Sequence, residues 1–122
     1  VIVDEFADLA VQLSNRQQKE PFYSNLRRIA QIGRKRGVHL VLCTQRPSAN
    51  LVPTDIRSLM NGRLALRVND AQSSRMILDE SGAQSLQPHG DMLYKESTEI
   101  IRAQGYYISV SELDKLMLHY GM

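Results

Sequence analysis

Two short apolar runs that end in polar side chains constrain the fold of this sequence more than any other feature. The first run is Val1–Val3, followed by Asp4 and Glu5, and the second is Val38–Thr44, followed by Gln45. Nearly continuous apolar runs of this length are typical of strands buried in a parallel sheet. Parallel strands joined by a helix bring their carboxyl ends to one sheet edge, where α/β folds bind ligands. We therefore expect Glu5 and Gln45 to emerge side by side.

The segment between these runs predicts the connecting helix. Apolar residues at helical spacing predict a helix over residues 22–36, with Pro21 in its first turn and Gly37 ending it as a C-cap. Residues 7–20 become polar after the first few positions, which indicates a loop or a weak helix.

The rest of the chain continues the alternation of helices and strands. It predicts a helix over 53–60, a strand over 63–68, a helix capped by Asp70 and running to Leu78, strands over 91–94 and 100–108, and a final helix capped by Ser111. This order indicates an α/β fold with a mainly parallel sheet flanked by helices, which ends in a β-hairpin and a helix.

The composition fits a globular domain and limits its chemistry. A formal net charge of +2 gives no argument for nucleic acid by itself. Basic residues crowd between Arg27 and Arg36, which fits either a phosphate-facing patch or a solvated helix face. The one cysteine, Cys43, lies in an apolar run, so we expect a small buried residue outside any disulfide framework. No apolar stretch is long enough for a membrane span.

The polar strand ends allow a particular chemistry. A carboxylate such as Asp4 can hold Mg²⁺, directly or through water, beside the phosphates of a nucleotide. Glu5 can orient or deprotonate an attacking water, and the Gln45 amide can sense a γ-phosphate. The same residue types also occur at ordinary strand ends, where acids begin a helix and an amide caps a neighbouring helix.

Several short motifs occur in an order that resembles one protein family. The segments DEFADL at 4–9, TQRPS at 44–48, RMILD at 75–79 and GDML at 90–93 resemble those of the FtsK/SpoIIIE DNA translocases. The resemblance extends to about residue 108 and implies a RecA-like P-loop ATPase core. It further implies a homo-hexameric ring around double-stranded DNA, with ATP and Mg²⁺ bound between subunits and hydrolysis driving the DNA through the pore.

Carried onto this chain residue by residue, the resemblance makes Asp4 the Walker B acid that holds Mg²⁺ through water. Glu5 becomes the catalytic carboxylate, and Gln45 becomes the γ-phosphate sensor. All three would also bind the cofactor ATP.

The resemblance also implies an arginine that acts in trans on the nucleotide of a neighbouring subunit. Our first choice is Arg63, with Arg67 and Arg75 as alternatives, and each of them is equally a candidate for a structural ion pair. Residues 48–57 and 72–75 are candidate pore segments that grip the DNA backbone without reading its sequence.

One motif of the family is missing. No G-x-x-x-x-G-K-[ST] phosphate loop occurs in the 122 residues. We therefore interpret residues 1–122 as the C-terminal part of one RecA-like ATPase domain, from the Walker B strand onward, which is an ATPase only within the full-length protein. The expected location is the cytoplasm, without direct membrane contact by this chain and with an inner-membrane anchor as an option for the full-length protein.

Three functions fit these motifs. The first is an ATP-driven translocase of double-stranded DNA, in chromosome segregation at cell division or in DNA transfer. The second places the same fold in a conjugative coupling protein or a type VII secretion ATPase. The third is a non-catalytic module that uses a motor fold for ring assembly. The residues of the segments DEFADL and GDML favour the DNA translocase.

Overall fold

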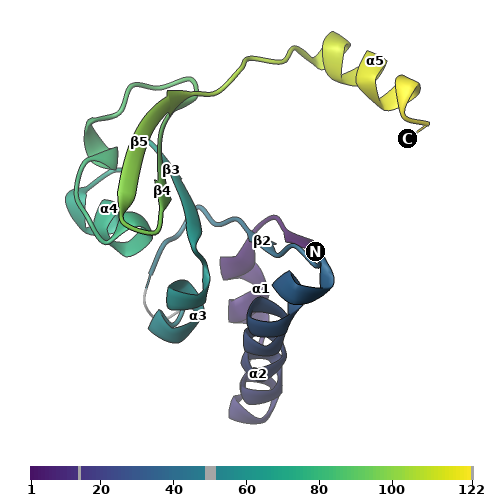
Figure 1. Cartoon of the computed structure of the whole chain (residues 1–122), viewed down its shortest axis with the longest axis vertical. Helices are drawn as coiled ribbons and strands as arrows, with labels where there is room; N and C mark the ends of the chain where they lie inside the picture. Colours follow the sequence, from purple (N-terminus) through teal and green to yellow (C-terminus); the bar gives the residue numbers. More distant parts are fainter. Residues whose placement is uncertain (14, 49–51, 122) are drawn as a thin grey trace.

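The computed structural model describes residues 1–13, 15–48 and 52–121. Its elements form an N-terminal group, a middle group built on a sheet, and a C-terminal helix that stands apart from both (Figure 1). None of the helices in the described part of the chain is long and apolar enough to cross a membrane.

The N-terminal group contains the two expected parallel strands. Its elements are β1 (Ile2–Val3), α1 (Phe6–Gln12), α2 (Arg16–Ile32), the 3₁₀ helix η1 (Gly33–Arg36), β2 (Val41–Leu42) and α3 (Thr54–Leu59). Strands β1 and β2 pair in parallel, with Ile2 opposite Val41. The parallel pairing is confirmed, but the expected burial is not, because Ile2 is 77% exposed. Within the described residues these strands form a sheet of only two, and the face that carries Ile2 and Val41 is exposed.

Most of the segment from residue 7 to residue 20 is helical, because it contains α1 up to Gln12 and the start of α2 from Arg16 on, which corrects the expectation of a loop or a weak helix. Asn15 caps α2 by accepting a hydrogen bond from the backbone N–H of Gln18 over 2.9 Å. The helix therefore begins at Arg16, and Pro21 lies inside it rather than in its first turn. The α-helix ends earlier than expected, at Ile32 with Gly33 as its C-cap, and η1 continues the helical segment to Arg36. Gly37 follows η1 with φ +70, the left-handed conformation expected of a glycine at a helix end.

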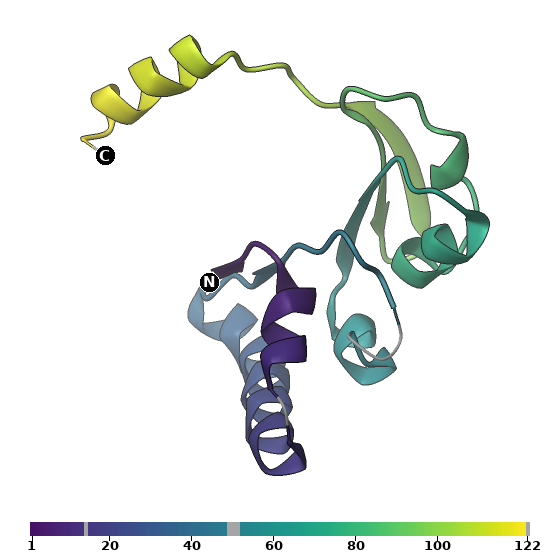
Figure 2. The same ribbon diagram turned by 180° about the vertical axis from the view of Figure 1, so that it is seen from behind.

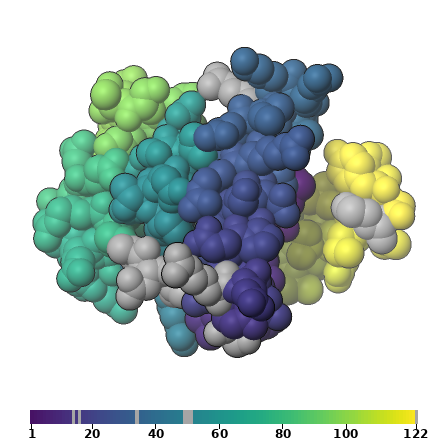
Figure 3. All heavy atoms as spheres, turned by 90° about the horizontal axis from the view of Figure 1, so that it is seen from below, coloured from purple at the N-terminus to yellow at the C-terminus, as the bar shows by residue number. Residues whose placement is uncertain are grey.

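The core of the N-terminal group centres on Phe6. Its buried residues are Phe6, Ala10, Leu26 and Ile56, contributed by α1, α2 and α3. The ring centroids of Phe6 and Phe22 lie 6.0 Å apart. Seen from below, α2 lies against the neighbouring segment that contains α3 (Figure 3). This packing holds α1, and hence the residues just before it, in a fixed position.

The middle group is an antiparallel sheet covered on one face. It contains β3 (Gly62–Leu66), α4 (Ala71–Leu78), the 3₁₀ helix η2 (Ala83–Ser85), β4 (Asp91–Glu96) and β5 (Glu99–Gln104), with strand order β3-β4-β5. The predicted hairpin is present as β4 and β5. The predicted α/β class holds, but β3 is not part of a parallel sheet, because β4 returns along it in the antiparallel direction.

Helix α4 packs on this sheet through a second core. Asp70 caps the helix as predicted, since its carboxylate accepts from the N–H of Ser73 over 2.7 Å. The core residues are Ala65, Leu78, Ala83 and Leu86, supplied by β3, α4 and the loop around η2. The two hydrophobic cores share no buried residue among those described.

The last helix, α5 (Val110–His119), has no buried residue. The view from behind also shows it away from both groups, at the end of an extended segment (Figure 2). Its N-cap is Ser109, not Ser111 as expected. Ser109 and Glu112 form a capping box, which requires a glutamate three residues after the serine, whereas Ser111 is followed at that spacing by Asp114.

Candidate functional site

Glu5 lies at the centre of the candidate site, between the carboxyl ends of β1 and β2. Its Oε1 accepts hydrogen bonds from the hydroxyl of Thr44 over 2.7 Å and from the backbone N–H of Ala7 over 3.0 Å. Its Oε2 accepts from the backbone N–H of Gln45 over 2.9 Å. The predicted juxtaposition of Glu5 and Gln45 is therefore present.

The parallel register explains why these residues meet. The N–H of Cys43 donates to Val3 O over 2.8 Å, and the N–H of Phe6 donates to Cys43 O over 2.8 Å. These bonds continue the ladder past β1 and set Glu5 level with Thr44. Cys43 itself is exposed, which corrects the expectation that it is buried, because the outer face of the two-stranded sheet is uncovered.

Glu5 also serves as the N-cap of α1, and its environment favours the charged form. The Gln45 backbone N–H, followed by the Thr44 hydroxyl, holds the pKa of the Glu5 carboxyl below its usual value of 4.5. The carboxylate is therefore ionised at neutral pH. Such a group is a good hydrogen-bond acceptor for water and a weak base, so the geometry suits orientation of a water more than removal of its proton.

Asp4 is exposed beside this cluster and has no hydrogen-bond or ion-pair partner among the described residues. No group of three or more potential metal ligands occurs in the described part of the chain. A single free carboxylate fits Mg²⁺ nevertheless, because this ion keeps several waters and binds through one or two carboxylates plus the phosphates of a substrate.

Gln45 contacts Glu5 through its backbone and not through its side chain. The residue is exposed, and its amide group has no partner among the residues that the structure describes. Since the backbone holds the loop in place, the side chain is free to face a ligand at the same sheet edge.

Arg63 makes the structural ion pair that was the alternative to a role in trans. Its Nη1 donates to Asp79 Oδ2 over 2.6 Å and to Ile77 O over 3.3 Å, and its Nε donates to Met60 O over 3.1 Å. Its side chain is only 18% exposed. In this conformation Arg63 ties β3 to the C-terminal end of α4.

Thr44 is the residue of the site whose contribution was not assigned from the sequence. Its position beside Gln45, at the end of an apolar run, was a sufficient signal to include it. A hydroxyl at that place can reach the neighbouring strand end, which is the contact that the structure shows with Glu5.

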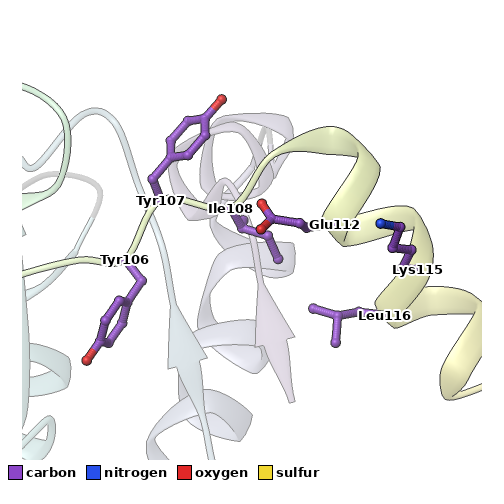
Figure 4. A pocket seen from close by; sticks show the side chains of 6 residues that line it. All are labelled: Tyr106, Tyr107, Ile108, Glu112, Lys115 and Leu116. Carbon is purple, nitrogen blue, oxygen red and sulfur yellow. The ribbon is translucent and has the colours of Figure 1, made fainter.

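A separate depression lies at the other end of the chain. It has a volume of ≈ 420 Å³ and is open to solvent, and it is lined by Tyr106, Tyr107, Ile108, Glu112, Lys115 and Leu116. The two tyrosine rings point in opposite directions from the extended segment before α5 (Figure 4). None of the predicted site residues contributes to it.

Comparison with known proteins agrees with the motifs of the site. The model of the FtsK/SpoIIIE family matches residues 1–49, which include both parallel strands and all residues around Glu5. DNA translocase FtsK of Haemophilus influenzae is 42% identical over 93% of this chain, and DNA translocase SpoIIIE of Bacillus subtilis is 36% identical over 98% of it. The chain belongs to the FtsK/SpoIIIE family. It spans only 21% and 15% of the lengths of these two relatives.

Two solved structures resemble this FtsK/SpoIIIE chain. The conjugation coupling protein TcpA of pCW3, in a monomer form with ATPgS, aligns with a TM-score of 0.80 and 22% identity, over 98% of this chain and 36% of its own. The cytoplasmic domain of the Thermomonospora curvata type VII secretion ATPase EccC aligns with a TM-score of 0.72 and 30% identity, over 88% of this chain and 12% of its own. These likenesses confirm the predicted α/β class of the fold.

Proposed function

We propose that residues 1–122 form the C-terminal part of a RecA-like ATPase domain in a translocase of double-stranded DNA. The observation that supports this most is the Glu5 carboxylate, which follows β1 and accepts hydrogen bonds from Thr44 and Gln45 just after the neighbouring parallel strand β2. The proposal extends to a homo-hexameric ring in the cytoplasm that acts in chromosome segregation, cell division or DNA transfer, with any membrane anchor outside this chain.

Each residue of the site has a separate task in this proposal. The free carboxylate of Asp4 holds Mg²⁺ through water beside the phosphates of ATP. When bound, the metal supplies positive charge that offsets the negative charge on the transferred phosphoryl group. Glu5, ionised and fixed, orients the attacking water. The free amide of Gln45 contacts the γ-phosphate and so responds to the state of the nucleotide.

Arg63 remains our proposed arginine in trans, and that role requires its guanidinium to leave Asp79. Arg67 and Arg75 are the alternatives, and both are already exposed. An arginine supplied by a neighbouring subunit stabilises charge in the transition state of phosphoryl transfer.

The substitution Glu5→Gln in the full-length protein tests the proposal. We expect ATP turnover to fall by at least about 100-fold while nucleotide binding persists, because misplacing a reacting group by about 1 Å costs about that much. Asp8→Asn is the matched control, since Asp8 is an exposed carboxylate on the same helix, and it should leave turnover unchanged. Normal turnover in Glu5→Gln would remove Glu5 from the site.

A conjugative coupling or secretion ATPase is the second candidate, supported by the likeness to TcpA and EccC. Binding of duplex DNA separates the DNA translocase from a secretion ATPase. A DNA motor contacts phosphates irrespective of sequence, so its affinity for duplex falls steeply with salt. A full-length protein that binds no duplex would favour secretion. One that turns over no ATP would favour a ring-assembly module.

A further inference from the structure

The hydroxyl of Thr44 links the Glu5 carboxylate to the loop after β2. Thr44 Oγ1 donates to Glu5 Oε1 over 2.7 Å and accepts from the backbone N–H of Arg46 over 3.1 Å. A hydroxyl has one hydrogen to donate and two lone pairs, so one orientation satisfies both partners. We propose that Thr44 is a positioning residue, which fixes the Glu5 carboxylate relative to the attacking water. This inference rests on the proposed function of Glu5.

The two carboxylate oxygens of Glu5 differ in how many further hydrogen bonds they can accept. Oε1 accepts from both Thr44 and Ala7, whereas Oε2 accepts only from Gln45 among the described residues. A carboxylate oxygen accepts about two hydrogen bonds. Oε1 is therefore filled, and Oε2 keeps one acceptor position for water. By occupying Oε1, Thr44 determines which oxygen faces the substrate.

Thr44 is also the one part of this arrangement that depends on a side chain. The other two donors to Glu5 are backbone N–H groups of Ala7 and Gln45, which any residue except proline would supply. Without the hydroxyl, Oε1 loses its shortest bond and the carboxylate is held by the two backbone N–H groups alone, which restrict its rotation less. A serine at position 44 keeps the hydroxyl, and a valine keeps the shape without it.

The test compares Thr44→Val with Thr44→Ser in the full-length protein, with ATP turnover measured over a range of ATP concentrations. We expect Thr44→Val to lower kcat about tenfold, as is typical when a residue that orients a functional group is lost. The KM for ATP should change less than twofold, because Thr44 contacts the carboxylate proposed to orient the water and makes no hydrogen bond to the Asp4 carboxylate or the Gln45 side-chain amide. Thr44→Ser should restore kcat to near the wild-type value. Circular dichroism melting confirms that both variants are folded.

A double substitution shows whether Thr44 acts through Glu5. When two residues act as a unit, their losses do not add, so Thr44→Val should cause no further loss of residual turnover in a Glu5→Gln background. Additive losses, a change in KM alone, or failure of serine to restore kcat would overturn the inference. If Glu5→Gln abolishes turnover and Thr44→Val does not lower kcat, the role of Thr44 fails and that of Glu5 stands. Normal turnover in Glu5→Gln means that the proposed function fails first.

Discussion

Replacing Phe6 with alanine is expected to destabilise the N-terminal group strongly. Phe6 is 0% exposed, and its ring lies 6.0 Å from Phe22 and 6.4 Å from Tyr23. Truncating a buried phenylalanine to alanine costs about 3–5 kcal/mol, because it removes buried apolar surface and leaves a cavity. The free energy of unfolding for a chain of 122 residues is roughly 6–18 kcal/mol. The substitution therefore removes a large share of it.

Urea unfolding, followed by circular dichroism, measures the effect. With a dependence on urea of about 2 kcal/mol per molar, a loss of about 4 kcal/mol lowers the midpoint by about 2 M. Leu118→Ala is the control, because Leu118 is 79% exposed on α5 and should change stability by less than about 0.5 kcal/mol. A midpoint shift in Phe6→Ala no larger than that of the control would refute the central place of Phe6 in the core.

Three further predictions concern stability. Arg63→Ala should lower the free energy of unfolding by about 1–3 kcal/mol in urea, because the charged hydrogen bonds to Asp79 and two carbonyls are lost. Arg102 lowers the pKa of Asp91 from 3.8 to about 2, so the stabilisation from Asp91 is complete above pH 3.8 and is lost as the pH falls through 2. Urea midpoints across this range should therefore fall more steeply in the wild type than in Asp91→Asn. Ser109→Ala should destabilise α5 locally by about 1 kcal/mol and reduce helical circular dichroism, without shifting the main unfolding midpoint, because α5 has no buried residue.

Matched controls accompany these predictions. Arg75→Ala is the control for Arg63→Ala, because it removes an exposed arginine of α4. If both variants lost the same free energy of unfolding, the structural role of Arg63 would be contradicted. For the acid range, identical pH profiles of the wild type and Asp91→Asn would mean that the contact with Arg102 contributes nothing. For α5, Ser111→Ala should leave the helix signal unchanged, and equal effects at Ser109 and Ser111 would rule out the capping box.

The features of the fold that were predictable from the sequence depend on local chemistry. Asp70 caps α4, and Gly37 ends the helical segment formed by α2 and η1, and both need only their neighbours along the chain. The meeting of Glu5 and Gln45 was also predictable, because parallel strands joined by a helix align their carboxyl ends.

The features that were missed depend on tertiary packing or on competing local signals. Pro21 is tolerated inside α2 because Asn15 starts the helix earlier and the following residues pack against Phe6. The burial of Cys43 depends on what covers β2, and the pairing direction of β3 depends on β4, almost thirty residues later in the chain. Neither dependence is visible in a residue's own neighbourhood.

The site shows the same division. Residue types at the strand ends indicated which groups would meet, but not that Gln45 would contribute its backbone while Thr44 contributed its side chain. The attachment of Arg63 depends on Asp79, which ends α4 in a left-handed conformation with φ 62 and brings its carboxylate within reach. Such a backbone conformation is uncommon for residues other than glycine, and although aspartate adopts it more often than most, the sequence does not show at which aspartate it occurs.

Two backbone amide protons hydrogen-bonded to Glu5 can report on the chemistry proposed for its carboxylate. The amide protons of Ala7 and Gln45 each point at one oxygen of that carboxylate, one from the helix and one from the loop. Their NMR chemical shifts would therefore report independently on Oε1 and Oε2. Any event that draws Glu5 toward a nucleotide would change both signals, and no side chain would have to be replaced or chemically modified to detect it.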